Sequence, residues 1–292
     1  MYMNISKLFF SIVLAGCIVS PGKASALVVF ADRPVDPVAQ GDSVLIPIYA
    51  DTEGVEVNSI EGSIIIEGGA TVNAITTGGS VFNLWPEKPS LSENVITFAG
   101  GTQSGVRGAR IRLFTIALVP TEKSNVLIRA KDINGYNADG TGSKIEGKTR
   151  AVAIPVNGSA TEMKNEFGNL ILSDTTAPKR FSIELGRDAS QYDGDFFVTF
   201  FAEDAETGIQ RYEVTEGGYG MVRSGSTYVL RDQTLRSPIE VKAIDMAGNE
   251  RVETFEYKGS SLLRTLIIAG AGLVLIIGAL FLLRKKKLLF WK

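Results

Sequence analysis

The stretch VEVNSIEGSIIIEGG (residues 55–69) carries the alternation of apolar and polar residues that decides the fold class. Within it the apolar residues move from odd to even positions, from Val55 and Val57 to Ile60, Ile64 and Ile66. Successive side chains of a strand point to opposite faces, so one buried face continues across this change only if the strand contains an extra residue. The sequence therefore predicts a long β-strand with a bulge near Asn58 and Ser59.

Beyond the predicted bulge, the residues between the buried isoleucines must face the other way. They are mostly polar but include one isoleucine: Ser59, Glu61, Ser63, Ile65 and Glu67. An apolar side chain on a polar face either belongs to a contact surface for a partner or is one of the single exposed apolar residues common on proteins. Both interpretations remain open at this point.

Short runs rich in β-branched residues, separated by Gly, Asn, Asp and Pro, surround this stretch. They cover residues 27–31, 43–50, 71–76, 94–100, 110–119, 125–130 and 150–156. We therefore expect an all-β sandwich or jelly roll over residues 27–156. Residues 157–177 lose the alternation, which predicts a linker with at most one helical turn near residues 162–167.

A second group of runs begins after Pro178, at residues 181–185, 195–204, 209–214, 227–232, 238–245 and 251–257. This number of short strands in about 80 residues predicts a small immunoglobulin-like sandwich over residues 178–257.

Both ends of the chain predict targeting segments. Residues 1–26 have a basic residue, an apolar run and a small-residue site typical of a signal peptide cleaved after Ala26. The alternative is lipidation of Cys17, the only cysteine, at the end of LAGC. Near the other end, residues 262–284 contain 19 uncharged residues (265–283) followed by RKKK, which predicts one transmembrane helix with residues 285–292 in the cytoplasm.

Composition excludes several classes of function. All 32 acidic residues lie between residues 27 and 257 with 21 of the 30 basic ones, so this part carries a net charge of −11 and is a poor match for nucleic acid. The chain has no histidine, which removes histidine-based nucleophile systems and the usual zinc sites. No pair of carboxylates stands out for glycoside hydrolysis. We therefore expect a binding or structural protein rather than an enzyme.

Residues 27–156 resemble a cohesin domain in four stretches: GDSVLIPIYAD (41–51), VNSIEGSIIIEGG (57–69), VITFAGGTQSGVRGARI (95–111) and INGYNADGTGS (133–143). The resemblance implies a nine-stranded jelly roll that binds a dockerin, a small protein module with calcium loops, through one flat sheet face. It also implies kinship with modules that bind polysaccharides on aromatic residues. The positions that match the cohesin face are Ser59, Glu61, Ser63 and Ile65, with Thr97 and Ala99 on the neighbouring strand.

Residues 178–257 resemble the immunoglobulin- or fibronectin-like modules of bacterial surface proteins, on the turns AEDAETGI (202–209) and KAIDMAGNERV (242–252). That resemblance implies a stalk or spacer. The whole chain is then a surface binding protein for a dockerin-like protein or a polysaccharide, or a purely structural stalk.

Three further motifs admit two interpretations each. In VFNLWPEKPS (81–90), which is too irregular for a predicted strand, Trp85 either contacts a sugar or caps the core with Phe82. Residues 135–146 partly match a calcium-binding loop but fit a glycine-rich hairpin turn better. A last group also suits either Ca²⁺ or turns, and we favour turns and no metal: Asp204, Glu206, Asp245 and Asn249.

Overall fold

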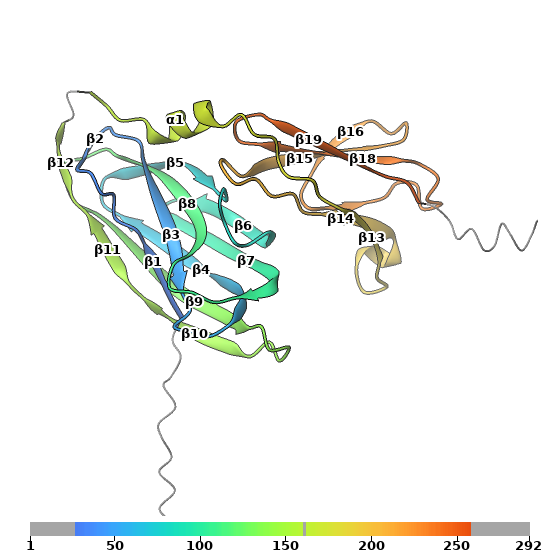
Figure 1. Ribbon diagram of the computed structural model, residues 1–292, viewed down its shortest axis with the longest axis horizontal. Coiled ribbons are helices and arrows are strands. Elements are labelled where there is room, and N and C mark those ends of the chain that lie inside the picture. The colour runs from blue at the N-terminus through green and yellow to red at the C-terminus, as the bar shows by residue number, and fades with distance from the viewer. Residues whose placement is uncertain (1–26, 160–161, 258–292) are drawn as a thin grey trace, which may run out of the picture.

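The computed structural model describes residues 27–159 and 162–257, which form two all-β domains (Figure 1). The predicted signal peptide, Cys17, the transmembrane segment and the basic tail lie outside the described residues. Within the described ranges, no helix has the length and apolar character needed to cross a membrane.

The first domain is a β-sandwich whose described strands form one continuous ten-stranded sheet and a small two-stranded one. The order of the large sheet is β5-β8-β3-β1-β10-β9-β4-β7-β6, with β11 beside β9. Its two halves fold over each other into two layers (Figure 1). The strands are β1 (Leu27–Ala31), β2 (Val38–Gln40), β3 (Val44–Asp51), β4 (Val57–Glu67), β5 (Ala70–Thr76), β6 (Leu84–Ser92), β7 (Val95–Val106), β8 (Ile111–Pro120), β9 (Val126–Asn137), β10 (Lys144–Thr149), β11 (Ala151–Ile154) and β12 (Val156–Ser159).

The core of this domain lies between the layers and consists mainly of the inward side chains of β3, β4, β7 and β8. Phe98 on β7 and Phe114 on β8 meet edge to face across it, with ring centroids 5.1 Å apart. Such aromatic pairs add to the free energy gained from burying apolar area. The layers are therefore joined by side chains whose positions follow the alternation along each strand.

The predicted bulge in β4 is confirmed. The pairing of β4 with both β7 and β9 shifts register between Val57 and Ser59. On the two sides of the shift, Val57 and Ile60 are both buried, although their positions differ in parity. The extra residue keeps one face of the strand in the core.

The expectation that residues 81–90 are too irregular for a strand is wrong. They enter β6, an edge strand paired with β7. Pro86 and Pro89 lack the N–H needed in a central strand, and the pairing shifts register around Glu87. Because an edge strand has one unpaired side, it tolerates both the prolines and the shifts.

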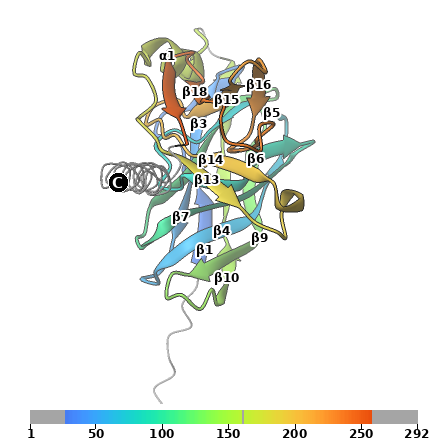
Figure 2. The same cartoon turned by 90° about the vertical axis from the view of Figure 1, so that its right-hand side faces the viewer.

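The second domain has two sheets within residues 178–257, in the orders β13-β14-β17 and β16-β15-β18-β19 (Figure 2). Its strands are β13 (Ile183–Arg187), β14 (Phe196–Phe200), β15 (Ile209–Glu216), β16 (Met221–Ser224), β17 (Thr227–Val229), β18 (Ile239–Asp245) and β19 (Glu250–Phe255). A short 3-10 turn covers Tyr192–Gly194. The core between the sheets is built on Val198, Phe200, Val214, Leu230, Ile239 and Val241.

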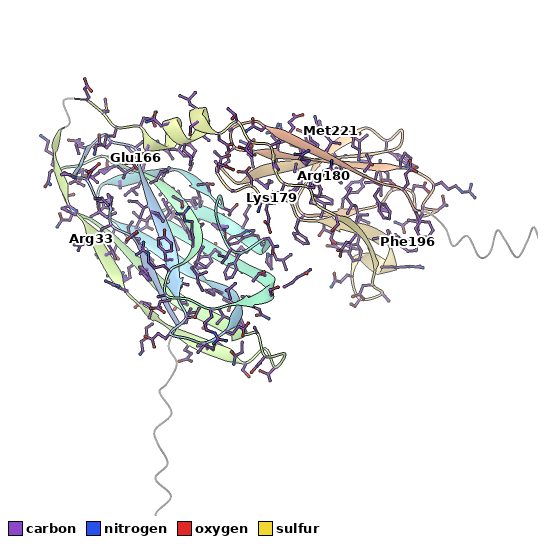
Figure 3. All side chains as sticks on the ribbon, viewed as in Figure 1. Arg33, Glu166, Lys179, Arg180, Phe196 and Met221 are labelled. Atoms are coloured by element: carbon purple, nitrogen blue, oxygen red, sulfur yellow. The ribbon has the colours of Figure 1, made fainter. Side chains whose placement is uncertain are left out.

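The segment between the domains holds a helix, α1 (Glu166–Ser173), where at most one helical turn near residues 162–167 was expected. Asn165 caps the helix by accepting the N–H of Gly168 at 2.9 Å. Glu166, labelled in Figure 3, accepts the backbone N–H of Leu45 at 2.8 Å and so fastens the start of α1 to β3. The bond to Leu45, which is far away in the sequence, explains why the local pattern underestimated the helix.

Candidate functional site

The six residues predicted to contact a partner lie together on the outer face of the layer formed by β4 and β7. Cross-strand pairing places Glu61 opposite Ala99 and Ser63 opposite Thr97. Ile96 and Phe98, which alternate with Thr97 and Ala99 along β7, are buried, so Thr97 and Ala99 face outward as the sequence predicted. All six side chains are partly exposed: Ser59, Glu61, Ser63, Ile65, Thr97 and Ala99. We call this group, with its neighbours on β6 and β9, the outer face.

Glu61 lies at the centre of the outer face and is held by two donors from β9. The Tyr136 hydroxyl donates to its Oε1 at 2.8 Å, and Asn134 Nδ2 donates to the same atom at 3.1 Å. The hydrogen bond to Glu61, then burial, raises the pKa of Tyr136. The carboxylate is therefore held in one orientation by two donors of the neighbouring strand.

Sequence reasoning missed Tyr136 and Asn134. A signal was present, because both alternate with Ile133 and Gly135 along β9. Their place beside Glu61 depends on the pairing of β9 with β4, which shifts register between Glu61 and Ser63. Such a shift leaves no clear sign in the pattern of apolar and polar residues along either strand. The neighbours of Glu61 are therefore seen only in the paired strands.

A shallow hollow of about 370 Å³ adjoins Glu61 on the outer face. Its floor is formed by small residues of β7, Ala99 and Gly101, and its rim includes Tyr136 together with Leu84 and Pro86 of β6. Small residues beneath larger ones leave room for a side chain of a partner. The hollow and the carboxylate beside it combine apolar contact with a directed hydrogen-bond acceptor.

An ion pair and a side-chain hydrogen bond lie along the outer face. Arg129 and Glu67 form an ion pair between β9 and β4, and Thr97 donates a hydrogen bond of 2.5 Å to Glu87 of β6. Ile65 lies between these pairs, opposite Val95 on one side and Arg129 on the other. The face is therefore mixed in polarity, with an apolar residue between two polar pairs.

Trp85 packs against the core of the first domain at the edge of its sheet. Its ring lies 6.0 Å from that of Phe82, edge to face, and a Cβ on Gly100 would come within 2.7 Å of the indole Cε3. Phe82 is buried, whereas Trp85 remains partly exposed toward the second domain. The residue therefore belongs to the core edge and not to the outer face.

Three buried carboxylates, from Asp174, Asp204 and Asp245, approach one another at one end of the second domain, with oxygen atoms within 4.8 Å. Burial, together with the charges of the other two, raises the pKa of Asp204. They are the groups of the described chain that could hold a divalent cation, since Ca²⁺ prefers oxygen ligands.

Of the residues the sequence singled out here, Asp204, Asp245 and Asn249 come together, while Glu206 contributes a backbone N–H to Asp204 at 3.2 Å. Asp174 was missed because it follows α1, far away in the sequence. The same carboxylates also order turns: Asp204 accepts the N–H groups of Thr207 and Gly208, and Asp245 accepts that of Asn249. This is the turn chemistry favoured from the sequence.

Residues 135–146 form the hairpin between β9 and β10, closed by a bond from Asn137 N–H to the Ser143 carbonyl at 3.0 Å. The Asp139 carboxylate accepts the N–H and the hydroxyl of Thr141, at 2.9 and 2.6 Å. These hydrogen bonds lower the pKa of Asp139. The loop therefore uses its acidic residue to close a turn.

Comparison with known proteins gives structural likenesses only, since no family model and no curated protein sequence matches the chain. Solved cohesin modules are similar over 46% of the chain. A non-cellulosomal cohesin from Archaeoglobus fulgidus shares 16% identity, with 91% of its length covered and a TM-score of 0.38. A cohesin module of a family 33 glycoside hydrolase from Clostridium perfringens shares 15%, with 99% covered and a TM-score of 0.39.

A type I cohesin–dockerin complex from Clostridium thermocellum is similar at 16% identity, with 96% covered and a TM-score of 0.37. The cohesin type of domain recognised in the sequence thus recurs among the solved structures similar to this chain. At these identities and TM-scores, no partner or site residue is carried over from them.

Proposed function

We propose that the chain is a cell-surface binding protein whose first domain docks a dockerin-type protein on its outer face. The observation that carries the proposal is Glu61, held by Tyr136 and Asn134 beside the hollow over Ala99 and Gly101. A carboxylate already fixed by two donors loses little side-chain freedom when a partner binds, so more of the contact energy appears as affinity. A purely structural stalk needs no such arrangement.

The composition of the outer face suits a protein partner. Ile65 and the hollow offer apolar contact, while Glu61, Thr97 and Glu87 offer directed hydrogen bonds around it. Specific protein interfaces combine an apolar centre with a polar rim in this way. The dockerin class of partner comes from the sequence resemblance. The apolar segment followed by RKKK supports attachment to the membrane, with the immunoglobulin-like domain as a spacer.

Titration of the full chain with a panel of dockerin modules, in Ca²⁺ and again in chelator, tests the proposal. We expect at least one module to bind in Ca²⁺, because dockerins fold around that ion. Ala99→Arg would fill the hollow and should abolish binding, while Thr71→Arg, at an exposed position of β5 in the other layer, should leave it intact. Equal binding by both variants, or no binding by any module, would refute the proposed function.

A further inference from the structure

The two domains enclose a cleft that belongs to neither alone, with a volume of about 350 Å³. One wall comes from β6 and the residues before it, which lie on the side of the first domain that faces the second (Figure 1). The other wall comes from residues 201–212 and the hairpin at residues 224–226. The volume falls in the range of small-molecule sites, which occur preferentially between domains.

Contacts between the domains hold these walls in place. Thr76 donates its hydroxyl to the carbonyl of Thr207, and Lys88 donates its ammonium to the carbonyl of Ile209. Gly78 lies so close to the second domain that a Cβ there would collide with the carbonyl of Glu206. Asn83 Nδ2 adds a hydrogen bond to Glu203 Oε1 at 3.0 Å. The cleft is therefore preformed, which lowers the cost of binding a ligand.

Aromatic side chains line both walls of the cleft. Trp85 and Phe82 come from the first domain, and Phe201 and Tyr212 from the second. The Tyr212 hydroxyl accepts the N–H of Ala202 at 2.8 Å, which leaves its hydrogen free to be donated. Burial raises the pKa of Tyr212 to about 12, so the phenol stays protonated. The walls thus offer ring surfaces together with a hydroxyl donor.

The polar groups of the cleft balance in charge. Lys88 and Arg211 face Glu203 and Asp204, two of each sign. Several of these groups already have partners, since Glu203 pairs with Lys179 and Arg211 with Glu213. Lys179, labelled in Figure 3, lies on the connection that enters the second domain. A charged ligand gains little from such a balance, so the site favours a neutral one rich in donors and acceptors.

A buried hydrogen-bond acceptor without a partner also favours a neutral ligand that carries donors. Among the described residues, Asn83 Oδ1 is the buried side-chain polar atom without a hydrogen-bond partner. A buried acceptor without a donor costs free energy, and a donor brought by a ligand would recover it. A peptide strand is a poorer match, because β6 at the rim carries Pro86 and Pro89 and lacks two N–H groups for strand pairing.

We propose that this cleft binds a neutral carbohydrate of one or two rings. The C–H face of the sugar packs on Trp85, and its hydroxyls bond to Asn83, Tyr212 and Gln210 at the edges. The second domain then supplies half of a binding site in addition to acting as a spacer. This site shares Pro86 with the hollow of the outer face but is otherwise lined by different residues, so either can fail without the other.

Saturation-transfer NMR of the full chain with cellobiose, chitobiose and maltose tests the proposal, with glucuronic acid as a charged comparison. Gly225 lines the cleft and has open space around its Cβ position, so Gly225→Phe should fold normally and block the site. Gly218 has the same open space but does not line the cleft, and Gly218→Phe is the matched control.

We expect at least one neutral disaccharide to bind, with an affinity reduced about tenfold or more by Gly225→Phe and unchanged by Gly218→Phe. Ile65→Asp on the outer face should leave sugar binding intact. No binding by any of the three disaccharides would overturn the proposal, as would equal binding by the two glycine variants, or stronger binding of glucuronic acid than of the neutral sugars.

Discussion

Tyr136 of β9 and Glu61 of β4 are joined by a hydrogen bond of 2.8 Å across the outer face. The same pairing occurs in the second domain, where the Tyr228 hydroxyl donates to Glu216 Oε2 at 3.0 Å. The two pairs differ in their surroundings, because Glu216 is buried while Glu61 is partly exposed beside the hollow. One pair lies at the edge of a core, and the other leaves a carboxylate at the outer face.

Replacing Tyr136 with Phe should weaken partner binding more than it weakens the fold. Glu61 would keep the bond from Asn134 but lose the donor that fixes its orientation. We expect a small loss in the free energy of unfolding, because the hydroxyl lies at the surface, together with a clear drop in affinity for the dockerin that binds the wild type. Calorimetric titration and urea unfolding measure the two effects.

Tyr228→Phe is the matched control for that change. It removes the same kind of bond from the second domain, so it should lower stability without altering dockerin binding. If both variants bind as the wild type does, Glu61 is not oriented for a partner.

Ile65→Asp should leave the melting temperature of the first domain almost unchanged and weaken partner binding at least about tenfold. The side chain points away from the core, and its full burial against a partner would contribute about 1.5 to 3 kcal/mol. An aspartate would also place an unpaired charge in the contact. Scanning calorimetry and titration check the two halves of this expectation.

Ile64→Asp tests the assignment of the two faces of β4. Ile64 is 1% exposed, so a charge there should unfold the domain. A large fall in melting temperature for Ile65→Asp, or none for Ile64→Asp, would show that the faces are reversed.

Trp85→Ala should cost stability in the first domain. The indole packs on Gly100 and against Phe82, so truncation leaves a void at the sheet edge. We expect a loss of about 2 to 4 kcal/mol, measured by urea unfolding followed through the fluorescence of Phe and Tyr. Trp85→Phe should recover part of the loss because it restores apolar volume. An unchanged free energy of unfolding for Trp85→Ala would contradict its role in the core.

The second domain should become less stable as the pH rises through the titration of Asp204. Burial raises the pKa of this carboxyl above its value in the unfolded chain, so the folded state binds the extra proton. The penalty for ionising it is absent below the unfolded pKa and complete above the folded one. Asp204→Asn should therefore flatten this part of the pH dependence, since an amide oxygen still accepts the N–H groups of Thr207 and Gly208.

Asp232 supplies a control of opposite sign. Hydrogen bonds from Thr234 and Ser237 lower its pKa, so its contribution to stability is present above the unfolded pKa and lost as the pH falls through the folded one. Asp232→Asn should reduce stability at neutral pH, whereas Asp204→Asn should not. Urea unfolding between about pH 2 and about pH 8, with divalent cations chelated, separates the two, since the effect of Asp232 lies below the unfolded pKa and that of Asp204 above it. Matching pH profiles for Asp204→Asn and the wild type would contradict the assignment.

The sequence by itself determined the all-β class, most of the strands, the bulge at Asn58 and Ser59 and the outward direction of Ile65. These features follow from alternation along one strand, because burial of one face imposes a period of two residues. β6 was missed because its prolines break that local pattern. A strand at the edge of a sheet tolerates prolines, but its position at the edge is a property of the whole sheet.

Only the tertiary structure decided which residues from separate strands become neighbours. Tyr136 lies beside Glu61 because of a register shift, and Asp174, which follows α1, lies beside Asp204. Trp85 and Tyr212, from different domains, line the same cleft. In each case the partners lie far apart in the chain and are brought together by pairing and packing of whole elements. A periodic pattern records the face on which a side chain lies, but contacts between faces are set by the packing of the complete fold.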